Sequence, residues 1–290
     1  MLEDERAADG RVVGTATVFL TGRACPWHCA MCDLWRGTIA QDTPRGALPR
    51  QLELVGERIA GAAHVKLYNA GSFFDSRAVP VDDYGAIAER VAGFENVVVE
   101  SHPALVGERL DRLRDSMAWA SPGAPPLLEV AMGLETAHPE ALRRLDKGVT
   151  VGQFATAAEA LRTRGVALRV FLLVGPPFVA PEEQDAWLLR SVETAFECGA
   201  SVVSLIPTRG GNPPLDAMIE AGAFHTPRLA DLERGFEAAL AAARGRGRVF
   251  ADLWNLARFA GCERCLPARR ERLHRANLEQ RLGDPVACDA

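Results

Sequence analysis

The sequence predicts an α/β protein, a partial (β/α)6 barrel followed by a short C-terminal extension. Three observations favour this fold. Short apolar runs rich in β-branched residues recur along the chain, amphipathic stretches separate them, and loops marked by Gly or Pro follow them. Apolar strands that alternate with helices are typical of a parallel sheet covered on both faces. A doubly wound sheet is the alternative, but no G-x-G-x-x-G motif follows the first run.

Seven runs are predicted to be strands because they are short, apolar and bounded by turn residues. In chain order they are 11–20, 64–70, 96–101, 127–134, 166–174, 201–206 and 248–253. Between them, stretches such as 48–62 and 151–165 have helical periodicity. In the second stretch Phe154, Ala158 and Leu161 share one face, and Gly165 supplies a stop signal.

The composition indicates a cytoplasmic protein without a membrane segment. The 290 residues are 48% apolar and 24% charged, and the net charge of −5 gives no general attraction to nucleic acid or anionic lipid. No apolar run reaches the length of a transmembrane helix, and the polar N-terminus MLEDERAADG does not resemble a signal or transit peptide. Seven clustered cysteines, an odd number, favour metal or redox use over disulfides.

Polar or Gly- and Pro-rich loops follow six of the predicted strands. The first contains the cysteines of 25–32, and the others are NAGSFFD (69–75), ESHP (100–103), GLETAHP (133–139), GPPF (175–178) and PTRGGNPP (207–214). The active site of an α/β barrel is built from the loops at the carboxyl ends of its strands. We therefore expect these loops to converge on one mouth.

The loop CPWHCAMC places Cys25, Cys29 and Cys32 in a C-x3-C-x2-C spacing. A structural zinc site would need a fourth ligand, for which His28 and the distant pair Cys262 and Cys265 are candidates. A four-iron cluster held by only three thiolates instead leaves one iron open for an exogenous ligand. The spacing alone leaves both uses open.

Cys25, Cys29 and Cys32 after the first barrel strand resemble the signature of radical S-adenosylmethionine (SAM) enzymes. The resemblance implies a TIM-like partial barrel and a [4Fe–4S] cluster whose open iron binds SAM. It also implies reductive cleavage of SAM, hydrogen abstraction from a substrate, and a reductant protein such as flavodoxin or ferredoxin. A plain iron–sulfur electron carrier or metal-binding protein is the alternative from another class.

The same resemblance assigns SAM-binding roles to residues in the loops. Asn69, Ala70, Gly71 and Ser72 stand where the family has a Gly-Gly-Glu-like segment, here without its glutamate. Glu135 matches a family contact to the ribose or methionine part of SAM.

Glu100 and Arg169 match no motif, and each has two possible roles. Glu100 could contact SAM or substrate, or it could belong to a capped loop before Pro103. Arg169 could pair with the SAM carboxylate, since arginine binds carboxylates with two hydrogen bonds, or it could be a solvated residue at a strand start.

The segments YNAGSFFD, VVESHP, GLET and LLVGPPF further resemble the branch that holds the radical SAM subunit of archaeosine synthase and the elongator-like enzymes. This resemblance implies a substrate such as a 7-deazaguanine adduct carried by tRNA, and a partner subunit. A maturase acting on a small natural product or peptide is the alternative within the radical SAM enzymes.

The predicted domain boundary separates a barrel at 1–256 from an extension at 257–290. Cys262 and Cys265, with Cys288 beyond them, could bind a second metal or cluster or form a redox pair. The stretch 268–281 carries five arginines, which predicts a C-terminal helix with a basic face, exposed to solvent or in contact with RNA phosphates.

Overall fold

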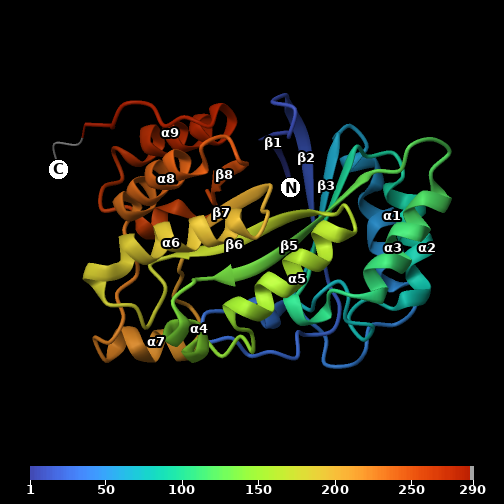
Figure 1. The fold of residues 1–290 in the computed structure, drawn as a ribbon, viewed down its shortest axis with the longest axis horizontal. Coiled ribbons are helices and arrows are strands. Elements are labelled where there is room, and N and C mark those ends of the chain that lie inside the picture. The colour runs from blue at the N-terminus through green and yellow to red at the C-terminus, as the bar shows by residue number, and fades with distance from the viewer. Residues whose placement is uncertain (288–290) are drawn as a thin grey trace.

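An eight-stranded sheet forms the centre of the computed structural model, which describes residues 1–287, and curls into a nearly closed barrel (Figure 1). β1 (Leu2–Arg6) pairs antiparallel with β2 (Val12–Leu20), and every later pair of neighbours is parallel. The other strands follow in sheet order as β3 (His64–Asn69), β4 (Asn96–Glu100), β5 (Leu127–Glu135), β6 (Ala167–Val174), β7 (Val202–Pro207) and β8 (Arg248–Ala251).

The seven predicted strands correspond to β2 through β8, so the predicted fold class is confirmed. The prediction missed β1, whose sequence LEDER is almost entirely polar. This strand pairs with β2 in a register that places Leu2 opposite Ala16 and Arg6 opposite Val12.

Helices cover the outside of the barrel, and two of them mark its mouth. In Figure 1, α4 and α7, which follow β5 and β7, lie along the lower edge of the molecule, at the carboxyl ends of the strands. The helices are α1 (Ala47–Ile59), α2 (Tyr84–Val91), α3 (Glu108–Ala120), α4 (Pro139–Arg144), α5 (Val151–Thr163), α6 (Gln184–Glu197), α7 (Pro213–Glu220), α8 (Leu229–Ala243) and α9 (Leu266–Glu279). Among residues 1–287, no helix is long and apolar enough to cross a membrane.

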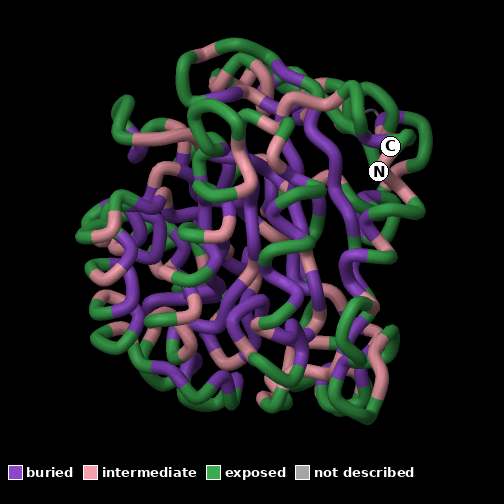
Figure 2. Tube along the Cα trace, turned by 90° about the vertical axis from the view of Figure 1, so that its right-hand side faces the viewer, coloured by how far each residue is buried: buried purple, intermediate pink, exposed green. Residues whose placement is uncertain are grey.

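The apolar core lies between the strands and the surrounding helices. Buried chain follows the strands, and exposed chain forms the outer turns and rims (Figure 2). Phe154, Ala158 and Leu161 on α5 are buried, as their spacing predicted, and Thr150 with Gln153 forms a capping box at the start of that helix.

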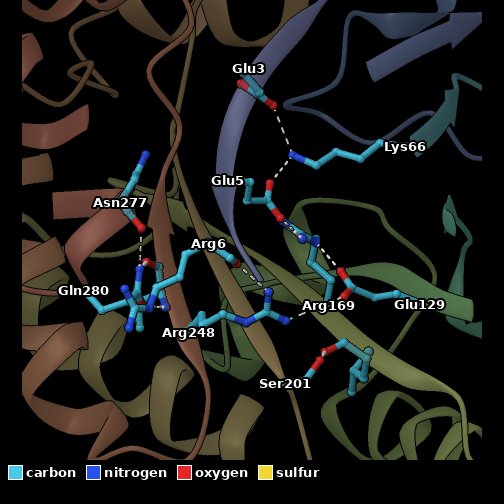
Figure 3. Close-up of polar contacts among 12 residues, drawn as sticks. Glu3, Glu5, Arg6, Lys66, Glu129, Arg169, Ser201, Arg248, Asn277 and Gln280 are labelled. Atoms are coloured by element: carbon cyan, nitrogen blue, oxygen red, sulfur yellow. Dashed lines mark hydrogen bonds and ion pairs between the residues drawn. The ribbon is translucent and has the colours of Figure 1, made fainter. Parts of the chain in front are cut away.

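The amino-terminal ends of the strands carry buried charges instead of apolar side chains (Figure 3). Arg169 on β6 donates from Nη2 to Glu5 at 2.6 Å and from Nε to Glu129 at 2.5 Å. Lys66 on β3 also pairs with Glu5, and its Nζ lies 3.1 Å from Glu3. We call these five residues the barrel floor. Their acidic members come from β1 and β5. The strand that the sequence analysis did not predict, β1, therefore supplies carboxylates that pair with Lys66 and Arg169.

The seam between the sheet edges β8 and β1 is bridged by the C-terminal helix. Asn277 on α9 accepts from the Ala251 N–H at 2.8 Å and donates to the Ala251 carbonyl at 2.9 Å. Gln280 does the same for Val249, at 2.7 and 2.9 Å (Figure 3). The two amides therefore satisfy the edge of β8 as a neighbouring strand would. The boundary at residue 256 stays a prediction, but the helix of the extension lies against the barrel.

The barrel floor predicts a large stability cost for Arg169→Met. This substitution removes the hydrogen-bonded cation of the buried carboxylates Glu5 and Glu129 and leaves Glu129 only Arg248, 3.9 Å away, so we expect the free energy of unfolding to fall by about 3–5 kcal/mol. Arg162→Met is the control because its pair with Glu159 is exposed, and it should cost about 0.5 kcal/mol or less. Urea denaturation measures both, and equal midpoints for the two variants would contradict the prediction.

Glu5 predicts how stability depends on acid. Burial raises the pKa of its carboxyl, but Arg169 and Lys66 outweigh burial and lower the pKa from 4.5 to about 2. A lowered pKa contributes stability above pH 4.5 that disappears as the pH falls toward 2. Glu5→Gln should therefore cost roughly 3 kcal/mol at pH 7, and its difference from the natural protein should narrow below pH 4.5. A difference that stays constant with pH would refute this assignment.

Candidate active site

Direct contacts join the loops that follow β2, β3, β4 and β5, which are four of the six loops predicted to converge at the mouth of the barrel. Ser72, after β3, hydrogen-bonds through Oγ to the Ser101 hydroxyl at 3.0 Å and accepts from the His102 N–H at 3.1 Å. The Phe73 N–H donates to the Glu100 carbonyl at 2.8 Å. Because these contacts join neighbouring loops directly, the predicted site residues of β3 and β4 form one surface.

The three cysteines of the first loop are half-buried and close to one another. Burial raises the pKa of Cys29 to about 12 and of Cys32 to about 11, and it also raises the pKa of Cys25. Negative charge on Cys25 or Cys32 raises the pKa of Cys29 further, whereas Lys147 opposes the shift. The thiols therefore stay protonated at neutral pH until a metal displaces their protons.

The donor set of this loop fits a [4Fe–4S] cluster. Within residues 1–287, no three His, Cys, Asp or Glu side chains gather around a point where a single metal ion could bind. In a four-iron cluster, each thiolate binds a different iron, so the sulfur atoms need not converge on one point. Cys25, Cys29 and Cys32 supply three soft ligands, and His28 beside them is exposed.

The NAGS segment turns sharply beneath the cysteine loop. A Cβ atom on Gly71 would lie 2.5 Å from the Arg23 carbonyl oxygen and 2.6 Å from the Ala78 Cβ, so only glycine fits there. Ser72 has a φ of 106°, a conformation that side chains rarely adopt. Asn69 is buried and Ala70 half-buried in the same turn. This turn brings backbone groups close to the segment that leads into the cysteines.

Glu135 ends β5 beside an irregularity in the strand. Its φ is 65°, and the pairing of β5 with β6 shifts between Gly133 and Glu135. A Cβ on Gly133 would lie 2.0 Å from the Glu135 Oε1, so the glycine makes room for this carboxylate. Lys147 Nζ donates to the same oxygen at 2.9 Å, and both side chains are buried.

Sequence reasoning missed Lys147, which lies in the segment LRRLDKGVT after GLET. One signal was available, because Lys147 is one of only two lysines in the chain. The other, Lys66, is buried in the barrel floor. Where almost all basic residues are arginine, a lysine is a candidate for an ion pair with a specific carboxylate.

Glu100 lies at the end of β4, at the same mouth. Burial raises its pKa to about 7, and the charge of Glu135 adds to the shift while that of Lys147 opposes it. Its carboxyl group can therefore hold or release a proton near neutral pH, as a general acid or base must.

Arg169 does not join the other predicted site residues, and this corrects the interpretation of the sequence. It lies near the start of β6, is 3% exposed, and its guanidinium binds Glu5 and Glu129 in the barrel floor (Figure 3). It is neither solvated nor open to a ligand carboxylate. The partner in position 5 is 164 residues away in the sequence, which is why the pattern around Arg169 did not reveal it.

Cys262 and Cys265 lie in the segment between β8 and α9, and Cys265 is the N-cap residue of α9. The Cys265 thiol lies 3.6 Å from the Cys262 carbonyl oxygen. Cys288 lies outside the described residues. A second metal or cluster at Cys262 and Cys265 therefore stays a prediction.

The turn at Gly71 predicts a selective response to Gly71→Ala. The added methyl group overlaps the Arg23 carbonyl, so the loop must shift, and we expect the free energy of unfolding to fall by about 1–3 kcal/mol. Gly56→Ala on α1 is the control because nothing lies within 4 Å of its Cβ position. That variant should gain about 0.5–1 kcal/mol from helix propensity. Equal denaturation midpoints for Gly71→Ala and the natural protein would contradict the geometry.

Comparison with known proteins finds relatives in sequence, although no protein-family model matches the chain. Archaeosine synthase subunit beta of Methanosarcina acetivorans is 26% identical over 227 residues, which cover 74% of this chain and 64% of the relative. The same subunit of Thermococcus kodakarensis is 30% identical over 131 residues, covering 44% of this chain and 39% of the relative. An uncharacterized protein of Methanocaldococcus jannaschii is 27% identical over 147 residues, 49% of this chain and 39% of that protein. The chain thus spans between 39% and 64% of the length of these relatives.

Solved structures share the fold at low sequence identity. Methylornithine synthase superposes with a TM-score of 0.59 at 14% identity, covering 81% of this chain and 64% of that one. SuiB of Streptococcus suis, bound to the precursor peptide SuiA, gives 0.55 at 15% identity over 88% and 51% of the two chains. Coproporphyrinogen III oxidase of Escherichia coli, a radical SAM enzyme, gives 0.50 at 13% identity over 80% and 53%. The chain is therefore similar in fold to radical SAM enzymes and similar in sequence to archaeosine synthase subunit beta.

Proposed function

We propose that this protein is a radical SAM enzyme in which Cys25, Cys29 and Cys32 hold a [4Fe–4S] cluster. One observation carries the proposal: three half-buried thiols lie in the loop after β2, at the mouth of a nearly closed barrel, and the sequence of that loop contains no fourth cysteine. Three thiolates leave one iron of the cluster open. That open position is where SAM would bind.

The residues of the mouth have distinct tasks in this proposal. The cluster, when bound, supplies the electron that cleaves SAM into methionine and a 5′-deoxyadenosyl fragment, which takes a hydrogen atom from the substrate. The Gly71–Ser72 turn offers backbone groups beside the cysteine loop, and Glu135 presents a carboxylate fixed by Lys147. Glu100 can move a proton near neutral pH. A flavodoxin or ferredoxin would provide the electron.

For the substrate, we propose a modified nucleoside, on the likeness to archaeosine synthase subunit beta. The substrate would be a 7-deazaguanine adduct in tRNA, and the word "subunit" in that relative's name suggests a partner chain. A peptide or small natural product is the second candidate, since SuiB, which shares the fold, is seen with a precursor peptide. An electron carrier without SAM chemistry is the third, but it would have no use for a mouth ringed by the turns of β3, β4 and β5.

Anaerobic reconstitution with iron and sulfide, followed by dithionite and SAM, should produce 5′-deoxyadenosine. Cys29→Ala should abolish both the cluster absorbance and the product, because two thiolates cannot hold the cluster. Cys198→Ala is the matched control, since Cys198 is a half-buried thiol at the end of α6 and should leave both unchanged.

An intact cluster that forms no 5′-deoxyadenosine would reject the radical enzyme and leave the electron carrier. To separate the substrates, deuterated candidates should be added to the reconstituted protein. Deuterium in 5′-deoxyadenosine identifies the substrate from which the hydrogen is taken. Transfer from a peptide but not from tRNA would replace the nucleoside proposal with the second candidate.

A further inference from the structure

Trp27, between the first and second cysteines, is wedged against two other loops. Its ring stacks on the His102 imidazole with centroids 3.6 Å apart and planes within 10°. On another side, a Cβ on Gly148 would lie 2.9 Å from the Trp27 Nε1, so the indole fits only because residue 148 is glycine. The φ of Gly148 is +69°, which also favours glycine there.

His102 is held from both ring nitrogens. Nδ1 accepts from the Ala104 N–H at 3.2 Å, and Nε2 lies 2.9 Å from the Lys147 carbonyl oxygen. Because a carbonyl only accepts, Nε2 carries the proton and the ring is neutral. Because both ring nitrogens have hydrogen-bond partners, this histidine has a structural role in the loop.

The segment 145–148 contacts the cysteine loop at one end and Glu135 at the other. The Leu145 carbonyl accepts from the Ala30 N–H at 2.9 Å. Two residues later, Lys147 holds His102 through its backbone and the Glu135 carboxylate through its Nζ, at 2.9 Å in each case. The cysteine loop and Glu135 are therefore joined by a continuous set of short contacts.

We propose that Trp27, His102 and Lys147 are positioning residues that hold the cysteine loop at a fixed distance from Glu135. We call these three residues the Trp27 relay. The inference rests on the proposed function, because it assigns to Glu135 a contact with SAM while the cysteines hold the cluster. In this arrangement SAM would have two contacts. The cysteine loop positions the cluster iron, and the Trp27 relay positions the Glu135 carboxylate relative to that iron.

Loss of the relay should weaken SAM binding without removing the cluster. Trp27→Ala, His102→Ala and Lys147→Met should each raise the SAM dissociation constant by about tenfold or more, as substitutions of outer-shell partners do. The dissociation constant is read from the change that SAM causes in the electron paramagnetic resonance spectrum of the reduced cluster, with iron content measured on each sample. Trp27→Phe keeps a stacking ring and should restore most of the affinity.

Trp119→Ala is the control because Trp119, on α3, is exposed and lies outside the mouth. It should bind SAM like the natural protein. If Trp27→Ala fails to load iron, the SAM dissociation constants of His102→Ala and Lys147→Met test the inference, since these variants leave the sequence of the cysteine loop unchanged. Natural SAM affinity in variants with a full cluster would overturn the inference while the proposed function stands.

A second measurement needs no SAM. In the cluster-free protein, hydrogen exchange of the backbone amides of 24–32 should be faster in Trp27→Ala and His102→Ala than in Trp119→Ala. If the natural protein neither binds nor cleaves SAM, the proposed function fails, and this comparison still tests the relay. Equal exchange in all variants would then show that the relay does not hold the loop.

Discussion

The barrel depends on Arg169, a buried cation that lies between the carboxylates of Glu5 and Glu129. A charge in an apolar interior is costly unless partners and hydrogen bonds compensate for it. β1 and β5 supply these partners, and Lys66 shares Glu5 with Arg169. The floor is therefore closed by ion pairs that tie the short antiparallel strand to the parallel sheet. The loops that carry the predicted cluster and SAM-binding residues lie at the opposite end of the strands.

The mouth of the barrel also contains a buried ion pair, but its surroundings differ from those of the floor. The pair Lys147–Glu135 is buried like the pairs of the floor, but it lies beside thiols and beside Glu100, whose pKa is raised to about 7 by burial. Ionisable groups whose pKa values are shifted by burial and by specific charged partners are typical of functional sites. One barrel thus holds buried ion pairs at both ends, among the charged residues of the floor and beside the thiols of the mouth.

Much of the fold and part of the site could be predicted from local patterns. The parallel strands were predictable because each is a short apolar run, and the mouth was predictable because polar loops follow those runs. β1 could not be found, since its buried side chain is the charged Glu5 and not an apolar residue. The place of Arg169 and the contacts of Lys147 depend on partners brought together only by the closed barrel, and no local signal encodes them.

The amides of Asn277 and Gln280 have a consequence for how the protein is made. They occupy the edge of β8 from the last helix, and the Arg6 guanidinium donates to the Leu278 carbonyl across 272 positions of the chain. Synthesis delivers residues in order, and contacts between distant positions form slowly. β1 therefore meets α9 only after all the residues between them have been made, and a nascent chain that stalls before α9 keeps the seam of its barrel open.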